Sequence, residues 1–222
     1  MIVIGLGNKA RHGKDTAAEA IMAHAKKMQY PVMKMSWASA LREEVNEAIA
    51  AHGSVESLLE CFMFVSSVHR GYMQGIPNWV TPTPDAVVDD ENLFGKHSTL
   101  LQWWGTDYRR VNFGLDYWVE KGKLKLDTFG KKYPNGIVLV PDTRFPNEAS
   151  TVENYYRGIT IQCTRLNQDG TPFRDPQRDP LHPSETGLDN YNWQHKIVSK
   201  SAALTGELAI TIFEFERGLR GF

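Results

Sequence analysis

The stretch that decides the fold is MIVIGLGNKARHGKDT, residues 1–16. Its apolar run at residues 2–4 predicts a buried β-strand, and the alanine-rich pattern after residue 15 predicts an α-helix. The loop between them carries Gly13 and Lys14 directly before the helix. A strand, a glycine-bearing loop, a lysine and a helix N-terminus, in this order, form a setting in which backbone N–H groups bind phosphate. The sequence therefore predicts a phosphate-binding loop.

This loop departs from the pattern G-x-x-x-x-G-K-[ST] at two positions. Asn8 takes the place of the first glycine, and Asp15 takes the place of the Mg²⁺-binding Ser or Thr, with Thr16 one residue later. Asparagine tolerates the left-handed backbone that glycine adopts, so we expect the loop to keep its form. The alternative interpretation is a basic turn that binds no ligand; the order of the elements favours phosphate binding.

Composition is ordinary for a globular α/β protein. The 222 residues suffice for one large domain, and the formal net charge of −1 provides no basic field for nucleic acid or a membrane. Cys61 and Cys163 lie in apolar patterns and are expected to be buried free thiols. No apolar run reaches 18 residues. We therefore expect a cytoplasmic protein with no membrane partner and no direct nucleic-acid partner.

Strand and helix patterns alternate along the chain. Strands are predicted at residues 32–35, 137–141, 159–165 and 196–199, and helices at 15–28, 38–49, 99–111 and 115–129, with further helices after Ser54 and from Pro146. A closing helix shows the apolar residues Leu204, Leu208, Ile212, Phe215 and Leu219. The alternation predicts an α/β fold, a P-loop NTPase-like parallel sheet with helices on both faces.

Two long segments lack a period. Residues 71–98 are predicted to form a surface insertion. Residues 166–187 carry Arg174 and Arg178 among prolines and glycines. We expect this second segment to be a lid-like loop that is open or disordered without nucleotide and closes over the phosphates with it.

Polar residues follow the most apolar predicted strand. Asp142, Thr143 and Arg144 come directly after residues 137–141, at the edge where parallel sheets bind ligands. Arg144 either contacts an anionic ligand there or pairs with Asp142 to brace the turn. Elsewhere, the histidines and cysteines show no zinc-binding spacing, so no structural zinc is expected.

Five motifs occur in an order that resembles a known family. They are GKDT (13–16), QWWGTD (102–107), YWV (117–119), VPDTR (140–144) and HPSE (182–185). In this order they resemble the bacteriophage deoxynucleoside monophosphate kinases of the T-even type, over most of the chain except residues 71–98. The resemblance implies one P-loop kinase domain over residues 1–222 that uses ATP and Mg²⁺ to phosphorylate a dNMP. It also favours a homodimer, in the host cytoplasm if the protein is phage-encoded.

The resemblance also implies roles for individual residues. The catalytic set is Lys14, Asp15, Arg165 and Arg174. The ATP-binding set is Asn8, Arg11, His12, Gly13, Lys14, Asp15 and Thr16, with Asp15 and Thr16 holding Mg²⁺ through Mg-ATP. The substrate-binding set is Arg42, Gln102, Gly105, Thr106, Trp118, Asp142, Thr143 and Arg144. Within it, Arg42 resembles a phosphate clamp and Trp118 is expected to stack on the base. The HPSE motif either pins the lid-like loop or contacts nucleotide.

Two other functions remain open at this stage. The chain could be a P-loop kinase that acts on another acceptor, such as a phosphorylated metabolite or a modified nucleotide. It could also be a nucleotide-binding protein without catalytic activity. The arginines in a flexible loop favour a closing catalytic site over the second alternative.

Overall fold

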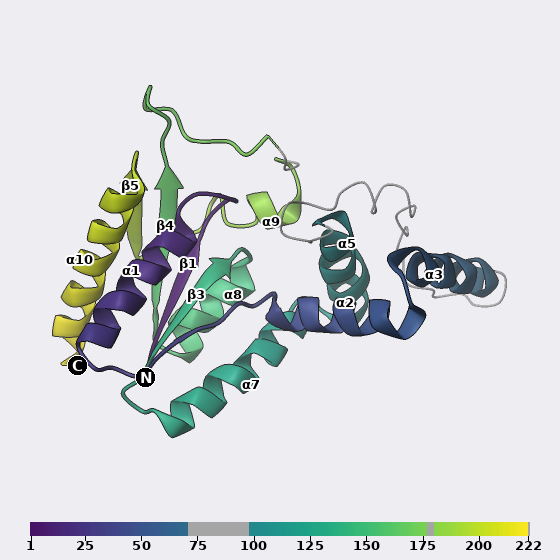
Figure 1. Ribbon diagram of the computed structural model, residues 1–222, viewed down its shortest axis with the longest axis horizontal. Helices are drawn as coiled ribbons and strands as arrows, with labels where there is room; N and C mark the ends of the chain where they lie inside the picture. Colours follow the sequence, from purple (N-terminus) through teal and green to yellow (C-terminus); the bar gives the residue numbers. More distant parts are fainter. Residues whose placement is uncertain (71–97, 177–179, 222) are drawn as a thin grey trace. The chain divides into compact units, whose positions relative to one another are not determined.

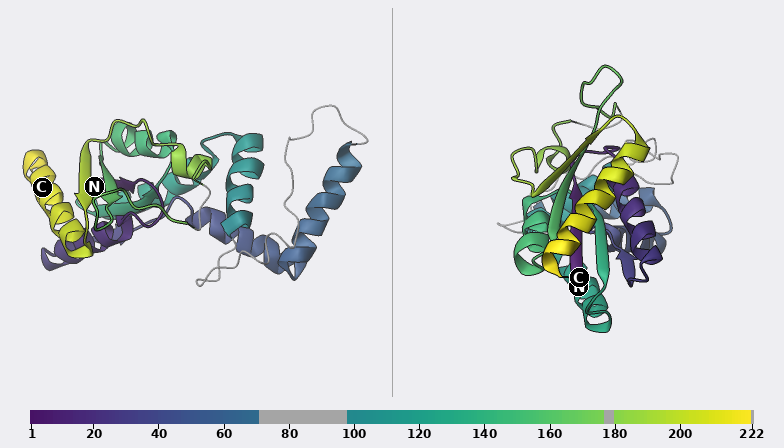
Figure 2. Two further views of the ribbon diagram at one scale, coloured as in Figure 1. Left: turned by 90° about the horizontal axis from the view of Figure 1, so that it is seen from above. Right: turned by 90° about the vertical axis from the view of Figure 1, so that its left-hand side faces the viewer.

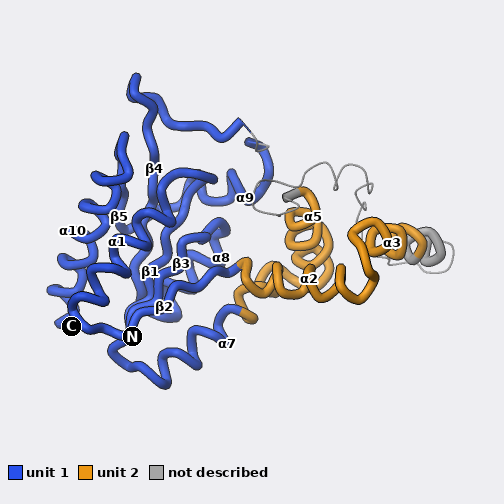
Figure 3. Tube along the Cα trace, in the orientation of Figure 1, with its two compact units in different colours: residues 1–37, 122–222 blue, residues 38–121 orange. Residues whose placement is uncertain are grey.

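The computed structural model describes residues 1–70, 98–176 and 180–221 of the chain. The chain divides into two compact units, Met1–Trp37 with Gly122–Phe222, and Ala38–Lys121 (Figure 3). Residues 71–97 of the predicted insertion, and Arg178 of the predicted lid, lie outside the described residues. That one kinase domain spans residues 1–222 stays a prediction.

The first unit is built on a parallel β-sheet (Figure 1). Its strands are β1 (Ile2–Gly7), β2 (Val32–Lys34), β3 (Ile137–Thr143), β4 (Ile159–Arg165) and β5 (His195–Ser199). Within the described residues they form a five-stranded sheet in the order β2-β3-β1-β4-β5, with every pair parallel. The chain leaves β1 toward β2 on one side, whereas β4 pairs on the other side. The carboxyl end of β1 is therefore a topological switch point, where such sheets bind ligands.

Helices cover both faces of this sheet, as predicted. On one face lie α1 (Lys14–Lys27) and α10 (Ala202–Arg220), side by side in Figures 1 and 2. Their buried residues form one core with the sheet, in which Ile4, Ile21 and Phe213 are fully enclosed. On the other face lie α8 (Pro146–Ser150) and η2 (Thr151–Tyr155), whose Val152 packs against Gly5 of β1.

The inward face of α10 differs from the predicted apolar stripe. Leu204, Phe215 and Leu219 are exposed, whereas Thr205, Gly206, Ala209 and Phe213 are buried. A β-carbon at Gly206 would lie 3.2 Å from Ala20 of α1. Small residues thus let α1 and α10 approach closely. Because these residues are not strongly apolar, the sequence pattern of α10 does not reveal this part of its buried face. Of the two cysteines that were expected to be buried, Cys163 is buried, but Cys61 is exposed.

The second unit is helical. It contains α2 (Ser39–His52), α3 (Val55–Arg70), α5 (Ser98–Gln102), η1 (Trp103–Arg110), α6 (Val111–Phe113) and the first residues of α7 (Tyr117–Lys132). The predicted helix at 99–111 is present, but residues 103–110 take the wider π-helical form. The helix predicted after Ser54 is α3, and Ser54 caps it, since its Oγ accepts a hydrogen bond from the Ser57 N–H at 3.1 Å. Trp103 and Trp104 lie in the core of this unit.

Gly7 ends β1 in a space that excludes a side chain. A β-carbon there would lie 2.0 Å from the Trp193 ring and 2.6 Å from the Thr143 carbonyl oxygen. Trp193 is buried, so it has no room to retreat. We predict that Gly7→Ala lowers the free energy of unfolding by about 1–3 kcal/mol through overpacking.

Gly218 provides the matched control for this substitution. It lies in α10, and a β-carbon added there would meet no other atom within 4 Å, so Gly218→Ala should stabilise the protein by up to about 1 kcal/mol. Urea unfolding measures both variants. Equal stabilities for Gly7→Ala and the parent protein would show that β1 does not end as described.

Candidate functional site

The loop between β1 and α1 has an unusual backbone. Asn8, Arg11 and Gly13 have positive φ angles of 111°, 58° and 86°. The Asn8 side chain donates hydrogen bonds to the Cys163 carbonyl at 2.7 Å and to Thr164 Oγ1 at 3.1 Å, both in β4. Asparagine therefore adopts the positive φ that was expected at the first glycine position, and it also fastens the loop to the sheet. Left-handed residues in a turn direct backbone N–H groups into a concavity that binds anions.

Lys14 brings a buried positive charge to this loop. It is the first residue of α1 and is only 6% exposed, and its ammonium donates a hydrogen bond to the Lys9 carbonyl. Burial, together with the nearby charge of Arg144, lowers the pKa of Lys14 to about 7, while Glu185 opposes the shift. The N-terminus of a helix is itself positive, so this position strongly favours a bound anion.

His12 connects the loop to the segment that follows β4. The Arg165 N–H donates to His12 Nδ1 at 3.4 Å, so the ring proton is on Nε2, which donates to the Phe173 carbonyl at 2.9 Å. Burial lowers the pKa of His12, and the nearby charge of Lys14 adds to this effect. A neutral His12 in this tautomer is thus a bridge between the loop, β4 and Phe173.

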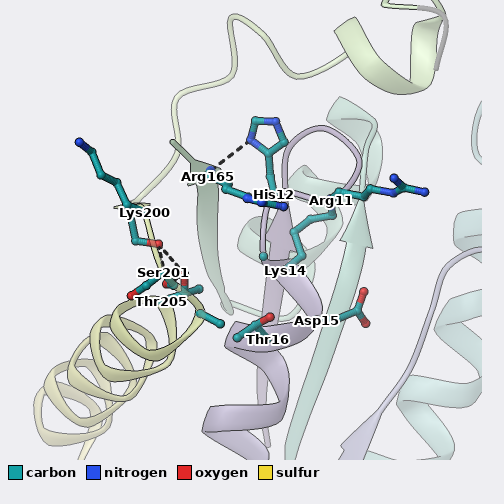
Figure 4. Close-up of a pocket in the computed structure, with 12 residues that line it drawn as sticks. Arg11, His12, Lys14, Asp15, Thr16, Arg165, Lys200, Ser201 and Thr205 are labelled. Atoms are coloured by element: carbon teal, nitrogen blue, oxygen red, sulfur yellow. Dashed lines mark hydrogen bonds between the residues drawn. The ribbon is translucent and has the colours of Figure 1, made fainter. Parts of the chain in front are cut away.

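A cavity of about 440 Å³ opens beside the loop (Figure 4). It is lined by Arg11, His12, Gly13, Lys14, Asp15, Thr16, Arg165, Ser199, Lys200, Ser201, Ala202 and Thr205. Two helices begin at this cavity, because α10 starts after Ser201, whose Oγ accepts the Leu204 N–H at 3.2 Å. Two helix N-termini and several cationic side chains make the cavity suited to a polyanion.

Part of this lining was missed from the sequence. Ser199, Lys200, Ser201, Ala202 and Thr205 were not among the predicted site residues. Ser199 ends β5 and Ser201 caps α10, and the Ser199 and Thr205 hydroxyls are 2.5 Å apart. A serine between a predicted strand and a predicted helix is a recognisable capping signal at the ligand-binding edge of a parallel sheet. That signal could have identified this turn.

The predicted catalytic residues are not all at the cavity. Lys14, Asp15 and Arg165 line it, although the Asp15 carboxylate is 72% exposed and forms an ion pair with Lys34 at 2.8 Å. Arg174 is exposed and is not among the lining residues. Of the described residues, no three His, Cys, Asp or Glu side chains come together in a group that could hold a metal ion.

At the carboxyl end of β3, the structure contradicts one of the two sequence interpretations, the pairing of Arg144 with Asp142. Asp142 accepts hydrogen bonds from Ser36 Oγ at 2.5 Å and the Trp37 N–H at 2.9 Å. Arg144 pairs with Glu185 at 2.6 Å, so the expected Asp142–Arg144 pair is wrong. The physical reason is that β3 ends at Thr143, and Arg144 therefore does not continue the alternation of the strand. Thr143 is fully buried and donates to the Val140 carbonyl at 3.3 Å, which makes it a core residue.

The segment after β4 lies against the loop between β1 and α1. We call its described residues 172–176 and 180–189 the strap. Asp175 pairs with Arg11 at 3.3 Å, Asp189 pairs with Lys9 at 3.1 Å, and Glu185 accepts the Ala10 N–H at 3.0 Å. The HPSE motif therefore pins this segment, as one of its two interpretations predicted. The expected open loop is not what the structure shows, because acidic strap residues meet the basic residues of the loop.

The other predicted substrate-binding residues belong to the second unit. Trp118 is 2% exposed and donates from its indole nitrogen to the Gly105 carbonyl at 2.9 Å. Its rings pack in a core, so the expectation that Trp118 stacks on a base is wrong for this structure. A β-carbon at Gly105 would lie 2.8 Å from Leu41, so this glycine allows a close approach within the unit. Gln102, Thr106 and Arg42 are partly exposed in this unit.

Comparisons with known proteins identify no family for this chain. No family model matches the sequence, and no curated protein is similar to it. Among the described helices, none combines the length and the apolar composition needed to cross a membrane.

The depressed pKa of Lys14 predicts how stability depends on pH. The folded pKa of about 7 lies below the ordinary value of 10.5, so above pH 7 the unfolded chain holds a proton that the folded protein lacks. Stability then rises with pH through this window. We predict that the free energy of unfolding of the parent protein, measured relative to Lys14→Met, rises between about pH 7 and 10 and is flat below pH 6. If the free energies of unfolding of the parent protein and of Lys14→Met, measured in urea, changed with pH in the same way, the burial of a titrating Lys14 would be contradicted.

Proposed function

We propose that this protein is a deoxynucleoside monophosphate kinase, which transfers the γ-phosphoryl group of ATP to a dNMP. The observation that carries the proposal is the cavity at the switch point of the parallel sheet. There the β1–α1 loop, the buried Lys14 and the N-terminus of α10 converge. The order of the five sequence motifs adds the dNMP as the acceptor.

The donor nucleotide fits the cavity by charge and by size. A volume of about 440 Å³ lies in the range that small-molecule sites usually have. The β- and γ-phosphates of ATP would bind the loop and Lys14, since both supply hydrogen-bond donors to an anion. The part of the cavity beside residues 199–205 would then take the nucleoside.

Magnesium would accompany ATP rather than occupy a site made by the protein alone. Mg²⁺ in nucleotide enzymes keeps several waters and is held mainly by phosphate oxygens and one or two side chains. Thr16 lines the cavity and has the hydroxyl for this role. Asp15 would have to release Lys34 before it could contribute.

The acceptor would bind beyond the carboxyl end of β3. Arg144 is the cation there, and its charge lowers the pKa of Lys14, so the two cations lie within electrostatic range. Phosphoryl transfer depends on positioning and on neutralising charge between donor and acceptor. Lys14, Arg165 and Arg144 could supply that charge. The roles of Arg42, Gln102, Gly105 and Thr106 in the second unit remain predictions from the resemblance.

The test is a coupled assay of ADP release with Mg-ATP and each dNMP and NMP in turn. We expect dNMP-dependent ADP release, and we expect Lys14→Ala to lower kcat by about a hundredfold or more, since a charge on the transferring group is worth several kcal/mol. Lys27→Ala is the matched control, because Lys27 is an exposed lysine at the other end of α1, and its kcat should be unchanged.

Three outcomes would change the conclusion. ADP release that requires a different phosphorylated acceptor would keep the kinase and replace the substrate. ATP binding without turnover on any acceptor would indicate a nucleotide-binding protein. Near-normal turnover in Lys14→Ala would remove the phosphate loop from the mechanism altogether.

A further inference from the structure

Glu185 is a buried carboxylate at which the strap, the phosphate loop and the end of β3 meet. Its Oε1 accepts a hydrogen bond from Arg144 Nη1 at 2.6 Å, and its Oε2 accepts the Ala10 N–H at 3.0 Å. The Glu185 side chain is only 4% exposed. A carboxylate buried this deeply keeps its charge only where cations and donors compensate for lost water. Ala10 and Arg144 therefore form a receptor for one anion, and Glu185 fills it.

The surroundings of this receptor are rich in positive charge. Lys14 and Arg144 repel each other, as the effect of Arg144 on the pKa of Lys14 shows. The charge of Glu185 has the opposite effect to that of Arg144, because it raises the pKa of Lys14 and also that of His12. The receptor thus lies within electrostatic range of the lysine that would hold the donor phosphates. An anion bound in it would be close to the transferred phosphoryl group.

The backbone of Arg144 is held in place independently of Glu185. Its backbone N–H donates to Glu148 Oε2 at 2.8 Å, and Glu148 also accepts the Phe145 N–H at 3.1 Å. Glu148 is itself buried in the first turn of α8. The backbone of Arg144 would therefore keep its place if the carboxylate of Glu185 were replaced by another anion. The Arg144 guanidinium also has a second acceptor besides Glu185, the Ser184 carbonyl at 3.1 Å.

We propose that Glu185 stands in for the phosphate of the acceptor, and that an acceptor phosphate binds Arg144 by displacing the Glu185 carboxylate. The inference deepens the proposed function and rests on it for the identity of the acceptor. A phosphate monoester offers more acceptor oxygens than a carboxylate to the same guanidinium and N–H group. A nucleoside without phosphate has no group that could replace Glu185, so this contact selects phosphorylated acceptors over nucleosides.

The experiment measures binding of inorganic phosphate by isothermal titration calorimetry, without ATP. Glu185→Gln keeps the size of the side chain and an oxygen for the Ala10 N–H, but it loses the charge that pairs with Arg144. If Glu185 occupies the receptor about nine-tenths of the time, removing it as a competitor should tighten phosphate binding about tenfold. Asp189→Asn is the matched control in the strap. Its pair with Lys9 is roughly two-fifths exposed on both sides, so affinity should change by less than about twofold.

A second substitution separates the receptor from a general effect of charge. In the double variant Glu185→Gln, Arg144→Gln the gain in affinity should disappear. Unchanged or weaker phosphate binding in Glu185→Gln would overturn the proposal and leave Glu185 as a brace. A gain that persists without Arg144 would overturn it as well, because the phosphate would then be responding only to the field around Lys14.

A measurement on the unmodified protein tests the proposal even if the variants do not fold. Hydrogen exchange of peptides within residues 180–189 should become faster when inorganic phosphate is added, because Glu185 leaves its partners. Unchanged or slower exchange would overturn the proposal. Neither readout uses turnover, so a protein that shows the displacement but releases no ADP would refute the kinase and keep the anion receptor.

Discussion

The burial of one ammonium group constrains much of the first unit. Lys14 lies at the N-terminus of α1, almost out of contact with water, in a region where the helix already contributes positive potential. Such a charge is tolerated only if acceptors surround it. The Lys9 carbonyl supplies one, and the charge of Glu185 supports it from the strap. The positive φ angles of the loop and the anchoring of Asn8 to β4 keep this arrangement in place.

The parallel sheet explains why distant parts of the chain contribute to one site. All strands point the same way, so the residues that follow β1, β3, β4 and β5 emerge at one edge. The loop, Arg144, Arg165 and the turn after Ser199 are therefore neighbours although they are far apart in sequence. Each adds a cation or a helix N-terminus. The result is a positively charged edge that is neutralised in part by the acidic strap.

The features that were predictable from the sequence are those set by local patterns. The strands, the alternation with helices, the loop between β1 and α1 and the helix after Ser54 each depend on a few neighbouring residues. In α10, Leu208 and Ile212 of the apolar pattern do pack against the core, but the small residues Thr205, Gly206 and Ala209 that share this face leave no apolar stripe. The π-helix at 103–110 also escaped notice, since an apolar pattern of this length does not distinguish a wider helix from an α-helix.

In the candidate site, the features that the sequence did not predict are those that depend on tertiary contacts. Arg144 and Glu185 are 41 positions apart, and nothing in either local sequence indicates that they pair. The expected partner, Asp142, was chosen because a continuing strand would have put it on the same face, but β3 ends one residue too early for that. Trp118 was assigned from resemblance alone, and its burial follows from the packing of the second unit.

The most direct measurement of the central claim is a crystal structure of the protein with ATP and Mg²⁺. The account predicts that the β- and γ-phosphates contact the backbone N–H groups of residues 11–14 and that the Lys14 ammonium leaves the Lys9 carbonyl to contact them. It further predicts that the nucleoside lies toward residues 199–205. Nucleotide bound elsewhere, with Lys14 still on the Lys9 carbonyl, would contradict it.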